Sequence, residues 1–570
     1  MTAAHDSVPI DTPNLSATIG APDLETQSPG ILDSLTRSPA PALLGEAVRG
    51  ADLAPVTQRH RSDGQASHVS PGGSRIVGRQ LTRMRWPVLV VLAAQVCLSA
   101  RLVWSNTAFQ DEALYLRAGH LEWAHWLHGA PIPDFPSYFS GSPVIYPPLA
   151  ALADSVGGLA AARVLSLCFM LGVTSLLWAT TDRLYGQRAA LLASALFATL
   201  AGTQFLGAFA TFDAMALLLL AFAAWLGVRS VDSQFPMSIV LLIATGAALA
   251  AADAVKYATA LFTPVVVVVV ALAVWRRRGL GVGVTAGLAV LGSWLILVIA
   301  AVFAGGRDYW LGISTSTLDR PESHAALTSV LQRAYVSTSL ILALAVLGAV
   351  LATRSEARGK LLPAALAVAA FLAPAEQARL HTTVSLQKHV VFGAWFAAIA
   401  AGYAMARLSR VDPGRGWAAV MVLPIAASTL FGSMGEAASL YKNWPNSAGV
   451  VSLLRSVTRN HPGNYLAEDY DVEAYYLRAE VPWQRWSNTY YFRYQGTPPG
   501  VASYEAAIYH HYFSLVILDF GDTAAADRQI ASDMRHAGSY HVLGRAGSFV
   551  VWASLHATSA RQARSPHGQG

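Results

Sequence analysis

Long apolar runs restrict the fold of this chain more than any other feature of its sequence. Between residues 86 and 434 they recur with lengths of roughly 18–22 residues, the length that crosses the hydrocarbon core of a bilayer. Inside lipid the backbone has to satisfy its own hydrogen bonds, which only helices and closed barrels achieve. The runs are continuous and do not alternate with polar residues, so they favour helices. The chain is therefore predicted to be mainly α-helical and to cross a membrane many times.

We expect about eleven transmembrane helices from these runs. They are placed at residues 86–104, 159–179, 189–207, 209–228, 237–253, 256–275, 280–303, 334–352, 361–375, 390–406 and 417–434. The composition agrees with a membrane protein, because only 13% of the 570 residues are charged, whereas about a quarter are charged in a soluble chain.

The basic residues predict the orientation of the chain. They precede the first run and occupy each connection that is expected on the same side of the membrane, namely Arg59, Arg61, Arg75, Arg79, Arg83 and Arg85, then Arg183, Arg188, Arg229, Arg276, Arg277, Arg278, Arg354, Arg358, Lys360, Arg407, Arg410 and Arg415. Positively charged loops stay in the cytoplasm. We therefore expect a multi-pass protein of the cell membrane with its N-terminus in the cytoplasm.

The membrane part is predicted to cover residues 83–434. Residues 1–82 are rich in Ser, Pro, Thr, Gly and Ala and are predicted to be a disordered cytoplasmic tail. The first outer loop, 105–158, contains an amphipathic stretch at 113–129 that is suited to lie as a helix in the membrane interface. The second long outer loop, 305–333, is polar.

The pattern changes after residue 434. Short apolar segments at 465–468, 515–520 and 549–553 are typical of buried strands, and 472–478 and 524–536 of helices. We interpret residues 435–557 as a small α/β domain outside the cytoplasm, followed by a disordered tail at 558–570.

Ionisable residues beside the predicted spans are the strongest sign of function, because a charge at membrane depth is costly unless it is paired. Under the expected topology they all fall near the outer ends of helices: Asp111, Glu112, Arg163, Asp213, Asp253, Lys256, Lys388 and His389. This concentration at one face of the membrane suggests a site there.

The acidic members have two interpretations. Asp111 and Glu112 follow the first span, where a carboxylate could act as a general base on a hydroxyl group. They could equally stabilise the start of a helix through its dipole. Asp213 lies among apolar residues and is either a catalytic group or one half of a buried ion pair.

The basic members could together hold a phosphate group. Arg163, Lys256, Lys388 and His389 are able to form charge-assisted hydrogen bonds with phosphate oxygens. Any one of them alone could reach the lipid headgroups instead. Four basic residues at one face of the membrane favour the phosphate-binding interpretation over contact with headgroups.

Two other classes of site are disfavoured. The cysteines, Cys97 and Cys168, both fall inside predicted spans and are interpreted as reduced packing residues. Basic residues are not interleaved with aromatic ones, so the sequence does not indicate a nucleic-acid partner.

A set of short motifs, taken in order, is similar to that of the GT-C glycosyltransferases. The set comprises the acidic pair 111–112 before the amphipathic helix, Tyr146-Pro-Pro-Leu149, Ala162-Arg163, Leu184-Tyr-Gly-Gln-Arg188, Asp213 in the fourth span and Val255-Lys-Tyr257. Over residues 86–434 the chain most resembles the branch that holds bacterial dolichyl-phosphate-mannose-protein mannosyltransferases and aminoarabinose transferases.

The resemblance implies an enzyme that uses a polyprenyl-phosphate monosaccharide and transfers the sugar, mannose or a related one, on the outer face of the membrane. The first-loop acid of the family maps to Asp111, with Glu112 beside it, and Asp213 joins them as a catalytic residue. The family's phosphate-binding residues map to Arg163 and Lys256, and we add Lys388 and His389 from their position and charge. The acceptor is a hydroxyl group on a protein, a lipid or a glycan. Some GT-C members use a divalent metal at the acidic residues, so a metal is left open.

The same residues suggest the chemistry independently of the family. Asp111 would take the proton of an acceptor hydroxyl, which attacks the anomeric carbon with inversion. Cations placed around the departing phosphate would stabilise its growing charge.

Three alternatives compete with this interpretation. A transporter or lipid flippase also carries buried charges, but such proteins tend to show internal repeats and sites at mid-membrane depth. A non-catalytic protein of envelope assembly would have no need of Asp111 and Asp213. Another GT-C activity, such as arabinofuranosyl transfer, fits the sequence as well as mannosyl transfer.

Overall fold

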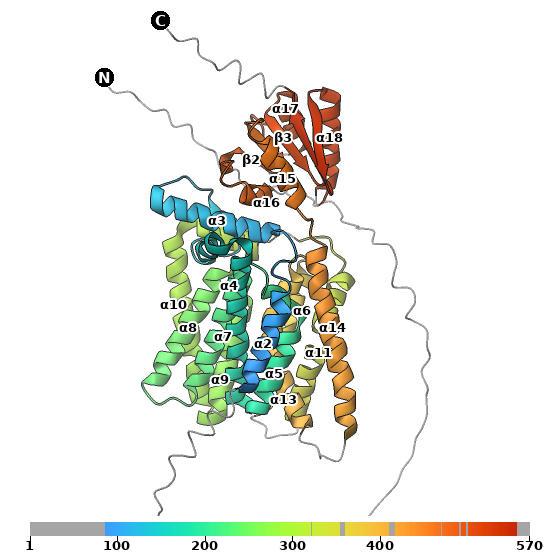
Figure 1. Cartoon of the computed structure of the whole chain (residues 1–570). Coiled ribbons are helices and arrows are strands. Elements are labelled where there is room, and N and C mark those ends of the chain that lie inside the picture. Colours follow the sequence, from blue (N-terminus) through green and yellow to red (C-terminus); the bar gives the residue numbers. More distant parts are fainter. Residues whose placement is uncertain are drawn as a thin grey trace, which may run out of the picture. The chain divides into compact units, whose positions relative to one another are not determined.

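The structure is a computed structural model that describes residues 86–555, apart from 321, 354–358, 410–415, 469, 490–491, 498–499 and 522. The predicted tails at 1–82 and 558–570 lie outside these residues. The part from Trp86 onward forms one compact unit, in which a helical bundle is followed by a small sheet domain (Figure 1).

The bundle confirms the prediction of a mainly α, multi-pass membrane protein. Its helices are α2 (Trp86–Ala100), α4 (Tyr146–Tyr185), α5 (Gln187–Thr199), α6 (Ala201–Leu206), α7 (Phe212–Ser230), α8 (Met237–Val255), α9 (Thr263–Arg278), α10 (Leu280–Ile313), α11 (Leu327–Thr353), α12 (Leu361–Arg379), α13 (Leu386–Leu408) and α14 (Gly416–Lys442). Within the described ranges, seven helices are long and apolar enough to cross a membrane, or eight if the bent α11 is one span. The number eleven is therefore not established by helix length and composition.

Helix α13 is the centre of the bundle. All its residues from Val390 to Ala401 are buried, and it packs against α11, α12 and α5. Small residues allow this close packing: a Cβ atom on Gly402 would lie 2.4 Å from the carbonyl oxygen of Ala189 in α5. The central position of α13 fixes the location of Lys388 in its first turn.

Several predicted boundaries were wrong. Helix α11 begins at Leu327 and not at residue 334, and α14 ends at Lys442 and not at residue 434. The predicted span 189–207 is divided at Leu200, whose extended backbone (φ −61°, ψ 139°) separates α5 from α6. Helix α4 begins at Tyr146, well before residue 159, and is interrupted at Gly157 and Gly158, the latter with a positive φ of 64° that favours glycine. Helix α10 continues beyond a similar break at Gly306 to Ile313, so the segment 305–313 is helical and is not a loop.

The amphipathic stretch of the first outer loop forms a helix, as predicted. Helix α3 (Gln110–His128) lies across the end of the bundle (Figure 1) and packs on the first part of α4. Gly119 permits the contact, since a Cβ atom there would lie only 1.9 Å from the carbonyl oxygen of Pro147. Helix α3 ends at the C-cap residue Gly129, which has a left-handed backbone conformation with φ 65°.

The C-terminal residues form the predicted α/β structure. Strands β1 (Asn464–Ala467), β2 (Trp486–Ser487), β3 (Phe513–Leu518), β4 (Tyr540–Ala546) and β5 (Phe549–Ser554) make one sheet in the order β2-β1-β3-β5-β4. The first three strands are parallel, and β5 is antiparallel to both neighbours. Four helices alternate with the first four strands along the chain: α15 (Ala448–Val457), α16 (Tyr470–Tyr476), α17 (Val501–Tyr509) and α18 (Ala524–Ala537). Strands β3 and β5 are buried throughout, as their apolar sequences predict.

Candidate active site

Two ion pairs lie at the end of the bundle that α3 covers. The carboxylate of Asp111, in the first turn of α3, contacts the ammonium group of Lys388 in α13. The carboxylate of Asp213, in the first turn of α7, contacts the ammonium group of Lys256, the C-cap residue of α8. The sequence predicted all four residues as site residues but could not pair them.

The two pairs differ in exposure. The side chains of Asp213 and Lys256 are almost fully buried, whereas 39% of the Asp111 side chain is exposed. Thr211 also donates a hydrogen bond to Asp213, at 2.9 Å. Asp213 is therefore a fixed counterion, and Asp111 is the carboxylate that a second molecule can reach.

Aromatic rings of the segment 209–213 join the two pairs. The Lys388 Nζ atom lies 5.4 Å from the centre of the Phe209 ring, and the Lys256 Nζ atom lies 5.2 Å from that of Phe212. The Phe212 ring in turn packs on Tyr115 of α3, with 4.4 Å between ring centres. These apolar walls exclude water and so strengthen the electrostatic interactions inside the site.

Tyr115 is a neutral hydroxyl group at this site. Its burial, followed by the charges of Asp111 and Asp213, raises its pKa well above the ordinary value of 10. The phenol therefore keeps its proton across the physiological range.

The connection between α3 and α4 fixes the backbone of Lys256. The Ser142 amide donates to Ala254 O at 2.8 Å, and the Tyr257 amide donates to Ser140 O at 3.0 Å. Between them, a Cβ atom on Gly141 would lie 2.0 Å from the carbonyl oxygen of Val255. Glycine at 141 is thus what lets the loop pair with the end of α8.

His389 is also part of the cluster. Its Nδ1 atom is 2.7 Å from the amide nitrogen of Gln377 in α12. Its ring also interacts electrostatically with Lys256, Asp213 and Lys388. The structure therefore brings together five of the predicted site residues, namely Asp111, Asp213, Lys256, Lys388 and His389.

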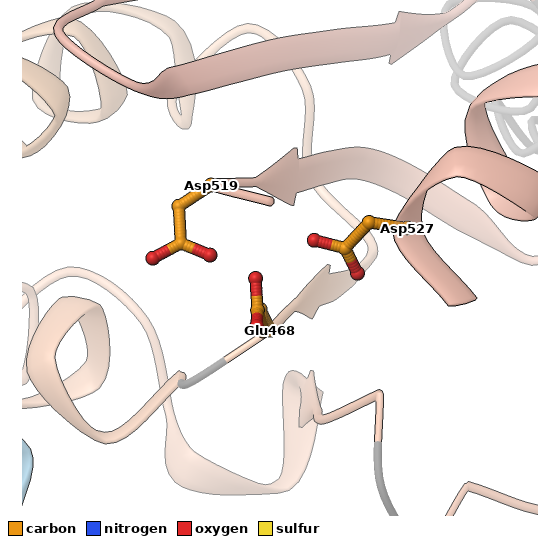
Figure 2. Close-up of side chains that lie close together, drawn as sticks. All are labelled: Glu468, Asp519 and Asp527. Carbon is orange, nitrogen blue, oxygen red and sulfur yellow. The ribbon is translucent and has the colours of Figure 1, made fainter. Parts of the chain in front are cut away.

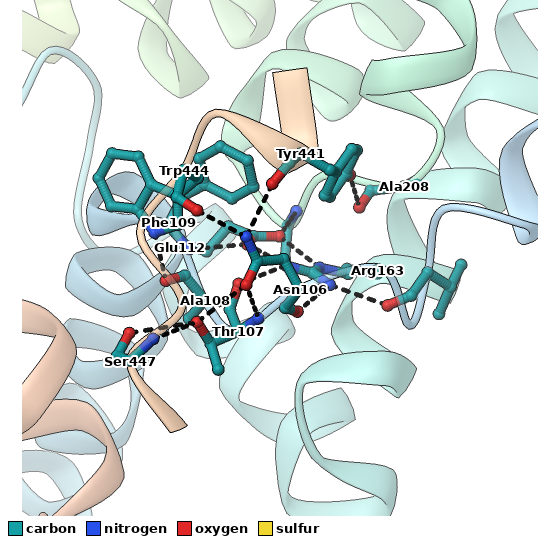
Figure 3. Close-up of polar contacts among 12 residues, drawn as sticks. Asn106, Thr107, Ala108, Phe109, Glu112, Arg163, Ala208, Tyr441, Trp444 and Ser447 are labelled. Atoms are coloured by element: carbon teal, nitrogen blue, oxygen red, sulfur yellow. Dashed lines mark hydrogen bonds and ion pairs between the residues drawn. The ribbon is translucent and has the colours of Figure 1, made fainter. Parts of the chain in front are cut away.

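Glu112 and Arg163, which were also predicted as site residues, form a separate buried cluster (Figure 3). Arg163 Nε and Nη2 donate to the Glu112 carboxylate at 2.8 and 2.6 Å. The remaining N–H groups of Arg163 donate to the backbone oxygens of Val103, Asn106 and Thr107.

Arg163 is thus placed differently from the expectation that it binds phosphate. A guanidinium group has five N–H donors, and the five hydrogen bonds above use all of them. Glu112 in turn accepts from the amides of Phe109 and Ala210, at 3.1 and 2.8 Å. Both side chains are fully buried, so this pair ties the first outer loop to α4 and to the start of α7.

Arg320 lies beside the candidate site and was not predicted from the sequence. It lies in the second outer loop, is half-buried, and interacts electrostatically with Lys388, His389 and Glu376. Within the part of the chain that the structure describes, no hydrogen bond or ion pair joins Arg320 to a partner. Its guanidinium group is therefore a cation beside the candidate site whose N–H donors are not used by any described residue.

A divalent metal does not fit the acidic residues of this cluster well. Lysine ammonium groups already contact the carboxylates of Asp111 and Asp213, where a metal ion would need them. The two lysines already place positive charge beside these carboxylates.

No family model matches the chain, and the comparison with curated proteins found no match. Solved structures do match. The crystal structure of ArnT from Cupriavidus metallidurans bound to undecaprenyl phosphate aligns with a TM-score of 0.54 at 17% identity, over 82% of this chain and 97% of ArnT. The oligosaccharyltransferase AglB from Archaeoglobus fulgidus, in complex with an inhibitory peptide and a dolichol-phosphate, aligns with a TM-score of 0.54 at 12% identity, over 86% of this chain and 75% of AglB. Both are GT-C membrane glycosyltransferases.

The chain has the GT-C fold. The resemblance that the short motifs suggested is therefore confirmed at the level of the fold. The ion pairs lie where α3 meets the ends of α7, α8 and α13.

A second acidic cluster lies in the C-terminal domain (Figure 2). One carboxylate oxygen each of Glu468, Asp519 and Asp527 lie within 4.8 Å of one another, at the carboxyl ends of β1 and β3 and in α18. Glu468 accepts the amide hydrogen bond of Gly521 at 3.1 Å, and Asp527 accepts that of Phe520, also at 3.1 Å.

These carboxyl groups share protons. Burial, followed by the neighbouring Glu468, raises the pKa of Asp519 and that of Asp527 to about 8 each. Glu468 has a lowered pKa, because hydrogen bonds from both neighbours outweigh its burial. At neutral pH, two protonated aspartates therefore donate to one glutamate.

We expect this cluster to make stability depend on pH. Between the ordinary aspartate pKa of 3.8 and the folded value of about 8, the folded protein holds protons that the unfolded chain has released. Stability should therefore fall as pH rises through this window. The lowered pKa of Glu468 acts only below its ordinary 4.5 and does not offset the fall.

Asp527→Asn tests this, since an amide donates to Glu468 at any pH. The thermal midpoint of the full chain in detergent should fall less between about pH 5 and about pH 9 in the variant than in wild type. Glu505→Gln, at an exposed position of the same domain, is the control and should follow wild type. Equal pH dependence in Asp527→Asn and wild type would contradict the shared protons.

Proposed function

We propose that this protein is a membrane glycosyltransferase that moves a sugar from a polyprenyl-phosphate donor to an acceptor hydroxyl on the extracytoplasmic face. The observation that carries the proposal is the cluster of Asp111, Lys388, Asp213 and Lys256 at the end of a GT-C bundle. The donor class is supported by ArnT and AglB, whose structures hold undecaprenyl phosphate and a dolichol-phosphate.

The transfer step follows from the exposure of the groups. Asp111 removes the proton of the acceptor hydroxyl, the oxygen attacks the anomeric carbon, and the bond from that carbon to the phosphate oxygen breaks. Attack from the side opposite the leaving group inverts the configuration. Asp111 suits the role of base because it is the exposed carboxylate of the cluster.

The cations stabilise the leaving phosphate. Lys388 and Lys256 lie next to the base, and Arg320 has N–H donors that no described residue uses. Charge grows on the phosphate as its bond to the sugar breaks, and fixed cations in a site with little water lower the energy of that state. Asp213 keeps Lys256 in place between turnovers.

The orientation supports the same proposal. The predicted cytoplasmic connections end in arginines, and Asp232 lies within ion-pair distance of Arg183 and Arg277 at that end of the bundle. The ion-pair cluster lies at the opposite ends of α7 and α8. With arginines in the cytoplasm, the cluster faces outward, as does the C-terminal domain.

The direct test is donor cleavage. Purified protein is given a panel of polyprenyl-phosphate sugars, with and without a crude acceptor extract, and released polyprenyl phosphate is measured. Wild type should release it from at least one donor, and the preferred donor identifies the sugar. Absence of release from every donor, with the protein folded, would overturn the proposal in favour of a transporter or an assembly protein.

Arg320 gives a sharper prediction. Arg320→Gln should raise the KM for the donor about tenfold, because it removes a charge-assisted hydrogen bond to the phosphate. Arg333→Gln is the matched control. Arg333 is an exposed arginine near the start of α11, and it contacts Thr383. Unchanged donor KM in Arg320→Gln would remove Arg320 from the site.

A further inference from the structure

The segment 106–109 leads directly into the first turn of α3, which carries Asp111. It has no helix or strand of its own. Arg163 holds the carbonyl oxygens of Asn106 and Thr107 from the membrane side. The other polar groups of the segment need partners elsewhere.

Those partners come from residues more than 330 positions later in the chain (Figure 3). Asn106 Nδ2 donates to the carbonyl oxygens of Tyr441 and Trp444, at 2.7 and 2.9 Å. The Ser447 amide donates to Thr107 Oγ1 at 3.1 Å. These bonds join the segment to the connection between α14 and the sheet domain.

Trp444 holds the end of the segment in two ways. Its indole nitrogen donates to the carbonyl oxygen of Ala108 at 3.0 Å. Its ring stacks on Phe109, with 4.8 Å between ring centres. Phe109 is the N-cap residue of α3, so Trp444 supports the point where the helix begins.

The sheet domain itself makes the last contact. The hydroxyl group of Tyr476, at the end of α16, accepts the amide hydrogen bond of Ala108 at 2.9 Å. Helix α16 is docked by two more interactions, an ion pair between Asp471 and Arg117 of α3 and a hydrogen bond from Tyr475 to Asp154 of α4.

We propose that the C-terminal domain positions the catalytic base, with Tyr476 as a positioning residue for Asp111. This inference rests on the proposed function. The amide of Ala108 is three residues before Asp111, so a displaced segment rotates or frays the first turn of α3. Asp111 then loses its fixed contact with Lys388, and a small misplacement of a reacting group is costly in rate.

The test uses the full chain and Tyr476→Phe, which removes only the hydroxyl group. Tyr540→Phe is the matched control. Its hydroxyl donates to Phe513 O at 2.9 Å within the same domain and far along the chain from the segment. Two quantities are measured, amide hydrogen exchange of the peptide covering 106–112 and the steady-state kinetics of donor cleavage.

We expect Tyr476→Phe to speed exchange of that peptide and to lower kcat about tenfold with the donor KM nearly unchanged, since positioning acts on the reacting state and not on donor binding. Tyr540→Phe should change neither quantity. Unfolding midpoints of the two variants are compared so that a general loss of stability is recognised as such.

Two results would overturn the inference. Unchanged exchange at 106–112 would show that Tyr476 does not hold the segment, and faster exchange with unchanged kcat would show that holding it does not position the base. If wild type cleaves no donor, the proposed function fails, and the role in catalysis fails with it. The exchange measurement then still decides separately whether the domain holds the segment.

Discussion

Asp111→Asn should lower kcat for sugar transfer by a factor of about 10²–10⁴ without unfolding the protein. The amide keeps the size of the side chain but cannot take the proton of the acceptor. Because Asp111 is partly exposed, its partner Lys388 can be hydrated when the carboxylate is lost. The donor KM should therefore change much less than kcat.

The measurement is polyprenyl phosphate release with the donor that wild type prefers. Asp134→Asn is the control, because Asp134 is an exposed carboxylate of the same outer loop. It should retain wild-type turnover. Full activity of Asp111→Asn would show that another group is the base, and the buried Asp213 would be the next to test.

Glu112→Gln, unlike Asp111→Asn, should strongly lower the stability of the folded protein. Removal of one partner of a buried ion pair costs about 3–5 kcal/mol, because the other charge is left without compensation. Arg163 and Glu112 are both fully buried, and the carboxylate also accepts two backbone amides. The variant should unfold at a clearly lower temperature than wild type in the same detergent.

Glu376→Gln provides the comparison. Glu376 pairs with Arg379 at 2.7 Å, but 35% of the Glu376 side chain and 53% of the Arg379 side chain are exposed, so water replaces the lost contact. Its unfolding midpoint should stay near that of wild type. If Glu112→Gln were equally stable, the pair with Arg163 would not be the anchor of the first outer loop.

The fold was predictable where one physical requirement dominates. Lipid forces apolar sequence into helices, and the positions of α7, α8 and α13 follow the predicted spans closely. The break at Leu200 was not predictable, because an extended leucine leaves no sequence signal. The break at Gly157 and Gly158 had a signal, two adjacent glycines before a long apolar run.

The site was predictable as a set of residues and not as a set of contacts. Charged residues near apolar runs marked Asp111 and Lys388, but they are 277 positions apart, and only the fold shows that they pair. The same limit applies to Arg163. Its residue type suggested a phosphate ligand, and only the fold shows that its donors all bond to Glu112 and to the backbone. Arg320 could not be predicted as a candidate site residue, because it lies in a polar segment, where an arginine is common without any functional role.

The two ion pairs have a consequence for the end of each turnover. The ionised side chains of Asp111, Lys388, Asp213, Lys256 and Arg320 carry one net positive charge, which a phosphodiester donor neutralises. After transfer, the protonated Asp111 leaves one more positive charge, and the monoester product, with nearly two negative charges, balances it. The balance is lost when Asp111 gives its proton to the outside solution. In the proposed mechanism, the loss of this proton therefore restores the base and weakens the binding of the lipid product at the same time.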